Sequence, residues 1–357
     1  MIIIIKASNV NLCYQCGKCT AICPVRRIIH TSPRGTIYDT YTYGSKNGDI
    51  WSCLTCGLCS TVCPQGIDYT AYILQKREGL KNNNLAHKGV FSEIGELMSV
   101  MDSSKVTDLE GNIDSNYGYF PGCLVFLNLF MDVGVDFNEI VSSSLKLLQH
   151  VEINPKIMQM KCCGHDLLWQ GNKSVFEKLR DWNTDYIEKS GIDTLIVSCA
   201  EGLKTFRQDY DLKNIEVMHI SEVLQDKLNI SIDNHLVVTY HDPCRLGRHL
   251  GIYDAPRKIL KNAGVTIEEM LHNRENALCC GVSSMMNCND RSKALRVTRL
   301  DEAKSTSADI LITTCPKCLA HFNCLKNEKD SVYNYDFEIM DLSVFLARNL
   351  KKGGNKG

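Results

Sequence analysis

Between residues 241 and 318 the cysteines fall in three groups: His241-Asp242-Pro243-Cys244, Cys279-Cys280-Gly281 and Cys315-Pro316-Lys317-Cys318. A hydrophobic run at Leu236–Tyr240 leads into the first group, and another at Ile310–Thr313 leads into the third. Short runs of this composition predict buried strands. Because cysteines at the ends of neighbouring strands in one sheet converge, we expect these five thiols to share one site.

Five thiols in one place favour an iron–sulfur cluster. Adjacent thiols such as Cys279 and Cys280 reach different irons of a large cluster more easily than they reach one small tetrahedral ion. Zinc takes four ligands in structural sites, and thiolates are the usual ligands of iron–sulfur clusters. A zinc site remains an alternative, as do thiols that are unligated or form disulfides.

The composition is that of a globular protein with an excess of cysteine. The 357 residues suffice for two or three domains, and a net charge of −1 argues against nucleic-acid binding by charge alone. No apolar run approaches the roughly 18 residues of a membrane span. Ile2–Ile5 is too short for a signal peptide and predicts a strand. The chain has 19 cysteines, and we expect this excess to reflect metal ligation, rather than a disulfide framework, in a cytoplasmic protein.

One cysteine run occurs twice near the N-terminus. Each copy has three cysteines spaced by two residues and a fourth cysteine followed by proline, at Pro24 and Pro64. A pair of zinc ribbons would not need that proline in both copies. The spacing is typical of bacterial ferredoxins, in which the fourth cysteine of each run ligates the other cluster. We therefore assign one cubane 4Fe-4S cluster to Cys13, Cys16, Cys19 and Cys63, and a second to Cys53, Cys56, Cys59 and Cys23.

From residue 117 onward the sequence repeats itself at a distance of about 120 residues. Tyr117–Phe120 precedes Cys123 as Leu236–Tyr240 precedes Cys244, Cys162-Cys163-Gly164 matches Cys279-Cys280-Gly281, and Cys199 matches Cys315. Amphipathic segments of helix length lie between the cysteines, near 135–149, 173–189, 255–263 and 290–305. Strands that alternate with helices predict an α/β fold with largely parallel sheets.

The domain organisation follows from these two repeats. We predict an N-terminal helical ferredoxin-like domain with two clusters over residues 1–105, with a polar linker at 102–116. Two pseudo-symmetric α/β modules follow, at residues 116–232 and 233–357, and we expect their cysteine sites to face each other.

The two modules differ at one cysteine. The second ends in Cys315-x2-Cys318, whereas the first ends in Cys199-Ala200-Glu201-Gly202, with glycine at the last position. Three interpretations stay open for the first module: a cluster completed by Glu201, water or an outside cysteine; a zinc ion; or no metal. We place the redox chemistry in the second module. The possible second site consists of Cys123, Cys162, Cys163 and Cys199.

Polar residues beside the cysteines are candidates for supporting roles. His165, His241 and His249 either supply protons or a hydrogen bond to a cluster sulfur, or are ordinary polar loop residues. Arg245 and Arg248 either hold an anionic group and offset cluster charge, or are charges on a helix surface.

These motifs resemble those of the D-type subunit of heterodisulfide reductase and of the wider CCG-domain family, which includes iron–sulfur subunits of glycolate, lactate and anaerobic glycerol-3-phosphate dehydrogenases. The resemblance covers about residues 10 to 348, and the run from His241 to His249 is a specific part of it. The sequence departs from the family at Gly202 and after Gly281, where many members carry a glycine-rich run. The resemblance implies a non-cubane 4Fe-4S cluster on Cys244, Cys279, Cys280, Cys315 and Cys318.

The resemblance also implies a function. Electrons would pass from the two cubane clusters to the non-cubane cluster for thiol/disulfide reduction, with these five cysteines, His241 and His249 as the catalytic residues. Disulfide cleavage takes two electrons and a cubane delivers one at a time, so a site that binds the first thiolate product to iron stabilises the half-reduced state. The alternative is an electron-relay subunit of a glycolate, lactate or glycerol-3-phosphate type of dehydrogenase complex.

Both functions require a partner, because the sequence contains no flavin or nucleotide fingerprint. We expect a flavoprotein or a membrane cytochrome b-type subunit to supply or accept electrons, and any membrane contact to run through that subunit. Reduction of a small thiol/disulfide substrate predicts an open cleft at Cys244, Cys279 and Cys280. A pure relay predicts that side chains close this site.

Overall fold

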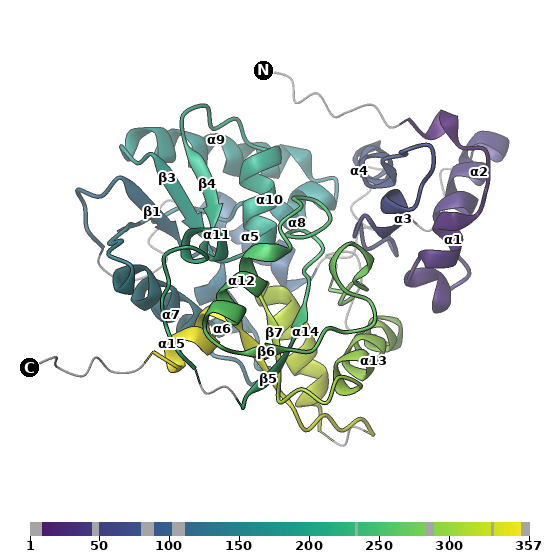
Figure 1. Ribbon diagram of the computed structural model, residues 1–357. Coiled ribbons are helices and arrows are strands. Elements are labelled where there is room, and N and C mark those ends of the chain that lie inside the picture. Colours follow the sequence, from purple (N-terminus) through teal and green to yellow (C-terminus); the bar gives the residue numbers. More distant parts are fainter. Residues whose placement is uncertain are drawn as a thin grey trace, which may run out of the picture.

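The structure is a computed structural model that describes residues 9–44, 50–79, 89–101, 111–232, 235–282, 289–329 and 332–350. The strand predicted at Ile2–Ile5 and residues 102–110 of the predicted linker lie outside these ranges. A helical N-terminal region lies beside two α/β modules (Figure 1), which confirms the predicted fold class. Among the described helices, none has the length and apolar character needed to cross a membrane.

The N-terminal region consists of short helices around the two cysteine runs. Gly17 and Gly57 precede α1 and α3 with φ angles of 85° and 77°, a left-handed conformation that glycine adopts without strain. The chain therefore turns sharply between the second and third cysteine of each run. The elements are η1 (Val10–Leu12), α1 (Lys18–Ile22), η2 (Val25–Arg27), α2 (Pro33–Tyr43), α3 (Leu58–Thr61), α4 (Tyr69–Gly79) and α5 (Val90–Val100).

The first module is a four-stranded parallel sheet with the strand order β2-β1-β3-β4. Its strands are β1 (Tyr117–Phe120), β2 (Lys156–Ile157), β3 (Thr194–Val197) and β4 (Glu216–His219). Its helices are α6 (Leu124–Phe130), α7 (Phe137–His150), α8 (His165–Trp169), α9 (Lys173–Lys189), α10 (Ala200–Gln208) and α11 (Ile220–Leu224).

The second module repeats this topology with the order β6-β5-β7-β8, again all parallel. Its strands are β5 (Val237–His241), β6 (Thr266–Ile267), β7 (Ile310–Thr313) and β8 (Glu338–Asp341). Its helices are α12 (Asp254–Asn262), η3 (Arg274–Asn276), α13 (Asp290–Lys304), α14 (Pro316–Lys326) and α15 (Leu342–Arg348). The identical order confirms that the sequence repeat is a repeat of structure.

The sheet order places the cysteines of each module together. In the first module β1 and β3 are neighbours, with Phe120 paired to Val197, and Cys123 and Cys199 follow their carboxyl ends. The loop after the edge strand β2 carries Cys162 on the other side of β1. The chain thus continues on one side of β1 with β2 and on the other side with β3. In open α/β folds, ligands bind at the carboxyl edge of the sheet where the strand order reverses in this way.

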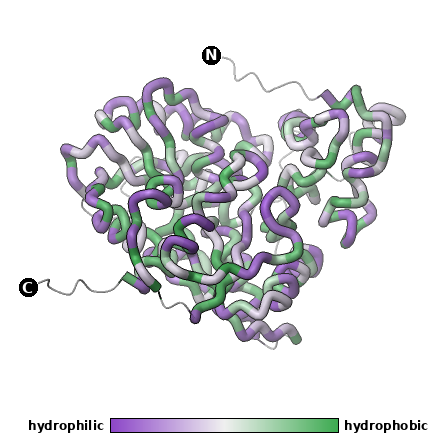
Figure 2. The backbone as a smooth tube through the Cα atoms, viewed as in Figure 1, coloured by the Kyte–Doolittle hydropathy of each residue, from purple (hydrophilic) through white to green (hydrophobic). Residues whose placement is uncertain are grey.

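The two modules pack through helix α7 of the first and helix α15 of the second. Helices α7 and α15 lie side by side (Figure 1), and Lys146 donates to the carbonyl of Ala347 at 3.0 Å. Hydrophobic and hydrophilic stretches alternate along the outer helices (Figure 2), as expected for helices with one face on a core. One hydrophobic cluster contains buried residues of both modules, so the modules share a core.

His219 makes the stability of the first module depend on pH. It caps α11, with Nδ1 accepting from the backbone of Ser221, and burial lowers its pKa from 6.5 to about 4. Folding keeps His219 neutral, whereas the unfolded chain takes up a proton on this ring below pH 6.5. The free energy of unfolding is therefore unaffected by protonation of His219 above pH 6.5, and we expect it to fall by about 1.4 kcal/mol per pH unit as the pH drops toward 4. His219→Asn keeps a cap and should flatten the decline in melting temperature between pH 7.5 and 5.5, whereas exposed His150→Asn should not.

Candidate functional site

The five cysteines of the second module meet at the carboxyl edge of its sheet. Cys244 follows β5, Cys279 and Cys280 follow β6, and Cys315 and Cys318 lie at the start of α14. The sulfur atoms of Cys280 and Cys318 are 3.1 Å apart. Cys279 contacts Cys244 and Cys280, and Cys315 contacts Cys318. The structure thus joins all five thiols in one group, and their role as ligands stays a prediction.

This group is shielded from solvent and carries no disulfide. Four of its five thiols are only 3–6% exposed, and the 18 cysteines in the described part of the chain are all free. Five thiols exceed the four ligands that zinc takes. The donor set therefore fits a larger iron–sulfur assembly.

Contacts inside the group favour the thiolate form of two cysteines. Burial would raise the pKa of Cys280, but hydrogen bonds from Cys279 and Cys318 hold it well below its ordinary value. Hydrogen bonds from Cys199 and Cys318 lower the pKa of Cys315 in the same way. Because metals bind the thiolate, the group is prepared for a soft metal.

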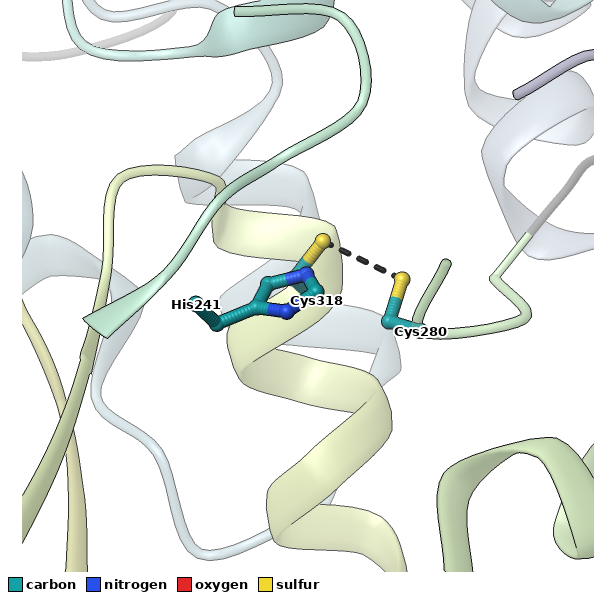
Figure 3. Close-up of side chains that lie close together, drawn as sticks. All are labelled: His241, Cys280 and Cys318. Carbon is teal, nitrogen blue, oxygen red and sulfur yellow. Dashed lines mark hydrogen bonds between the residues drawn. The ribbon is translucent and has the colours of Figure 1, made fainter. Parts of the chain in front are cut away.

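His241, the last residue of β5, brings an imidazole to these thiols. One of its ring nitrogens lies within 4.8 Å of the sulfur atoms of Cys280 and Cys318 (Figure 3). Arg299 donates from Nε to Nδ1 of His241 at 3.0 Å, and since a guanidinium only donates, the ring proton lies on Nε2. Nε2 is buried and has no hydrogen-bond partner among the described atoms. His241 therefore offers the sulfurs a hydrogen-bond donor and not a free metal-binding nitrogen.

Replacing His241 with leucine removes this donor. We expect the midpoint potential of a cluster on the five cysteines to fall by about 60 mV or more, because a hydrogen bond to a charged group contributes about 1.5 kcal/mol and 59 mV corresponds to a tenfold change for one electron. A redox titration followed by EPR measures the shift. His150→Leu, at an exposed position, is the control. Equal potentials in the parent and His241→Leu would contradict this role.

Lys317 lies between Cys315 and Cys318 and forms a buried ion group with the first module. Its ammonium is 2.5 Å from Asp166 and 2.5 Å from Glu201, and all three side chains are at most 11% exposed. Burial would lower the pKa of Lys317, but the two carboxylates hold it well above its ordinary value. Burial also raises the pKa of Glu201 to about 8. These ion pairs fix the cysteine turn of the second module against the first module.

The thiols of the first module border the same boundary. Cys162 contacts Cys163, and Cys199 contacts Cys315 of the second module. The two sites therefore face each other, as the repeat predicts. A Cβ added at Gly202 would lie 3.7 Å from the Cβ of Cys199, an ordinary contact, so lack of space does not explain the missing fifth thiol. Metal binding by Cys123, Cys162, Cys163 and Cys199 stays a prediction.

The N-terminal cysteines surround two cavities. One is bordered by Cys13, Cys16, Cys19 and Cys63, which we call the distal set. The other is bordered by Cys53, Cys56, Cys59 and Cys23, which we call the proximal set, and Cys59 borders both cavities. The fourth cysteine of each run thus lies with three of the other run, the arrangement that cross-ligation requires. Ligation by these residues stays a prediction.

The proximal set reaches the second module directly, because the thiols of Cys56 and Cys279 are in contact. Arg245 donates to the carbonyl of Thr55 at 2.6 Å and to its hydroxyl at 2.7 Å. Arg248 donates to the carbonyl of Cys56 at 2.6 Å. At 4% exposure Arg245 is not a charge on a helix surface. The two arginines hold the N-terminal region against the second module.

The other two histidine candidates lie at the same junction. His249 Nε2 is 3.0 Å from the carbonyl of Thr55 and 2.8 Å from Arg245, while His165 Nε2 accepts from Arg245 at 3.2 Å. Burial and the charge of Arg245 hold the pKa of both rings well below the ordinary value. They are neutral hydrogen-bonding groups in this structure, and a catalytic role for His249 stays a prediction.

Three buried charged residues of the site escaped the sequence analysis: Lys317, Asp166 and Arg299. Lys317 lies inside a cysteine motif and Asp166 lies two residues beyond Cys162-Cys163-Gly164, so a charge next to the cysteines predicted to bind metal was an available signal. Arg299 lies on α13, and its sequence position gives no comparable signal.

Two protein families match the chain. A 4Fe-4S dicluster domain matches residues 9–67, and a cysteine-rich CCG domain matches twice, at residues 117–206 and 238–323. The three matches correspond to the N-terminal region and the two modules.

Curated relatives come from methane-producing archaea, among other sources. An uncharacterised iron–sulfur protein of Methanococcus maripaludis is 27% identical over 95% of this chain and 62% of its own length. The D-type subunit of dihydromethanophenazine:CoB–CoM heterodisulfide reductase from Methanosarcina barkeri is 25% identical over 97% of this chain and 95% of its own length. The B-type subunit of fumarate reductase (CoM/CoB) from Methanothermobacter marburgensis is 28% identical over 94% and 71%, respectively. The chain spans less than two thirds of the length of several such relatives.

A crystal structure of a hypothetical protein from Helicobacter pylori is similar in fold. Its TM-score is 0.56 at 12% sequence identity, and the match covers 90% of this chain and 65% of that one. At this identity the similarity concerns the fold alone.

Proposed function

This chain belongs to the family of iron–sulfur proteins that join a 4Fe-4S dicluster domain to CCG cysteine-rich domains, and on that premise we propose that it is an oxidoreductase component similar to the D-type subunit of heterodisulfide reductase. Electrons enter at the distal set, pass through the proximal set and reach the five cysteines of the second module, where a disulfide is reduced. The observation that carries this proposal is the hydrogen-bonding interaction between the side chains of Cys56 and Cys279, which links the proximal set to the five cysteines of the second module.

The proposed cofactors are a cubane 4Fe-4S cluster at each N-terminal set and a non-cubane 4Fe-4S cluster at the five cysteines of the second module. When bound, such clusters supply one-electron transfer, and the last would supply chemistry with paired electrons. The buried thiolates and the unpartnered Nε2–H of His241 support this assignment.

Reduction of a disulfide consumes two electrons and two protons and yields two thiols, so the site also needs protons. Glu201 borders the cavity of the five cysteines, and burial raises its pKa to about 8, so its carboxylate can take up and release a proton close to neutral pH. Lys317 holds this carboxyl at 2.5 Å. Glu201 is therefore our proposed proton source, with Lys317 as the residue that positions it.

The proposed partner is a protein that supplies the electrons, either a flavoprotein or a membrane cytochrome b-type subunit. The names of two relatives, one from a heterodisulfide reductase and one from a fumarate reductase, describe subunits of larger enzymes. By analogy, this chain works within a complex.

A second candidate function, electron relay without a substrate, is favoured by one observation. The cavity at the five cysteines is bordered by Leu54, His165, Glu201 and Val282, and four of the five thiols are at most 6% exposed. Among the described residues the site is closed, which is what a relay predicts. Residues 283–288, which follow the cavity wall at Val282, lie outside the described ranges.

EPR of the oxidised full-length protein tests these functions against each other. Addition of candidate thiols should produce a new paramagnetic signal if the second module handles thiol/disulfide substrates. A full spectrum of reducible clusters that no thiol alters would support the relay instead. An iron content near twelve atoms per chain is expected for two cubanes and one further four-iron cluster. A content near eight would mean that the five cysteines of the second module hold no cluster, which would contradict both functions.

A further inference from the structure

The outer end of the N-terminal region carries an exposed aromatic face, formed by Tyr14, Arg34, Tyr38, Tyr41 and Tyr43. The four tyrosines are between 48% and 71% exposed. They are four of the five tyrosines among the large exposed hydrophobic side chains in the described residues, the other being Tyr333. Such a concentration differs from the single apolar residues that normally scatter over a protein surface.

Most of this face is the outward side of α2. Arg34, Tyr38 and Tyr41 are spaced by four and three residues, so they lie on one side of the helix. The ring of Tyr43 packs edge-on against Tyr38, with centroids 6.2 Å apart. The buried residues of α2 lie on another side of the helix and are Pro33, Thr36 and Ile37. The helix is therefore anchored on one side and presents aromatic rings on the other.

The aromatic face adjoins the distal set. Tyr14 and Arg34 border the cavity of the distal cysteines, and the Arg34 guanidinium lies 3.6 Å from where a Cβ on Gly17 would be. Cys16 of the distal set is the one exposed cysteine among those the structure describes. Helices α3 and α4 contact η3 and α8 of the modules, whereas α1 and α2 lie at the far end of the region (Figure 1).

Apart from the cysteines themselves, the charged side chains around the cavity of the distal set are all positive. Lys18 and Arg34 border its cavity, and no acidic side chain does so among the described residues. Residues 9–44 carry Lys18, Arg26, Arg27 and Arg34 against the single acid Asp39, although the whole chain has a net charge of −1. A positive surface steers negatively charged proteins toward it and repels positive ones.

We propose that the aromatic face is the docking surface for an acidic one-electron redox protein, which exchanges electrons there with the distal set. The proposal rests on the electron-transfer part of the proposed function. One electron leaves the carrier and one arrives at the distal set, with no bond or proton transferred. Tyrosine and arginine are enriched in protein interfaces, and electron-transfer encounters use small contact areas, so one helix face and one loop provide enough surface.

The test measures electron transfer into the full-length, cluster-loaded chain by stopped-flow absorbance. The electron donor is a reduced acidic 2Fe-2S ferredoxin, and the comparison donor is the same ferredoxin made basic by chemical amidation of its surface carboxylates, so that both donors carry the same 2Fe-2S cluster. We expect the rate constant with the acidic donor to exceed that with the basic donor and to fall at least about tenfold between about 50 mM and 500 mM salt. Tyr38→Ser/Tyr41→Ser should lower the acidic-donor rate constant at least tenfold.

The controls separate docking from folding and from the proposed function. Tyr333→Ser/Lys178→Glu changes an exposed tyrosine and an exposed lysine elsewhere and should keep the parent rate constant. Reduction by dithionite should be the same in all variants, and its failure in the parent would refute the proposed function and not the docking surface. Tyr41→Asp provides a second, single variant at a 61% exposed position.

Three results would overturn the proposal. The first is a parent rate constant in Tyr38→Ser/Tyr41→Ser and Tyr41→Asp while their EPR spectra match the parent. The second is a faster reaction with the basic donor. The third is a parent that sediments as a dimer while the two variants sediment as monomers, since the aromatic face would then be a contact between copies of this chain.

Discussion

Replacing Cys318 with serine is expected to remove about four of about twelve iron atoms per chain and to reduce turnover with a disulfide substrate at least 100-fold. The sulfur of Cys318 lies 3.1 Å from that of Cys280, and Cys318 also contacts Cys315. The substitution therefore removes a thiol that links two other members of the five-cysteine group. The N-terminal sets are not altered, and their EPR signals after reduction should remain. Iron analysis and EPR of the same samples measure both effects.

The matched control is Cys324→Ser on the same helix, α14. Cys324 is half-buried and does not border the cavity of the five cysteines. We expect this variant to keep the parent iron content and activity. If Cys318→Ser also kept about twelve iron atoms, the second module would not hold the proposed cluster. Cys162→Ser extends the series to the first module, where a further loss of iron would show that this module binds a cluster too.

Hydrophobic runs and repeated motifs predicted the elements that position the site. The strands at Tyr117–Phe120 and Ile310–Thr313 agree residue for residue with β1 and β7, and the segment at 173–189 agrees with α9. These elements have strong local patterns, with a short run of mostly apolar residues in each strand and an apolar face that recurs every three to four positions in the helix. The repeat then predicted that the two modules share one topology, because both contain the same pattern of strands, helices and cysteines.

Elements that depend on tertiary contacts were not predicted. β2 and β6 have two residues each and exist through backbone pairing with β1 and β5, which leaves almost no signal in the sequence. The contact between Cys56 and Cys279 joins segments more than 200 residues apart, and cysteine spacing carries no information about it. The same holds for Arg245, whose partner Thr55 lies 190 residues away.

Charge complementarity between the modules was also invisible in the sequence. The repeat aligned Cys199 with Cys315, and so placed Glu201 and Lys317 at equivalent positions of the two modules. Their opposite charges form an ion pair only because the pseudo-symmetric packing brings the two side chains to 2.5 Å. The departure from symmetry at these positions thus serves the contact between the modules.

Replacing Lys317 with methionine is expected to destabilise the protein by about 3 to 5 kcal/mol. The change leaves Asp166 and Glu201 buried without their cation, and breaking a buried ion pair by removing one partner has a cost of about this size. Because loss of clusters makes unfolding irreversible, the measurement is the apparent melting temperature at a fixed scan rate. At an unfolding entropy of about 2.1 cal/mol/K per residue, a drop of roughly 4 to 7 °C is expected for a chain of 357 residues.

Two variants test whether the effect arises from unpaired charge. Lys317→Met combined with Asp166→Asn and Glu201→Gln removes both carboxylates, so it should recover most of the lost melting temperature. Lys189→Met breaks an ion pair with Asp185 in which both side chains are more than 60% exposed, and should shift the melting temperature by about 2 °C at most. If the triple variant were as unstable as Lys317→Met, the loss would come from packing of the lysine side chain. The ion pairs would then not be what holds the cysteine turn of the second module against the first.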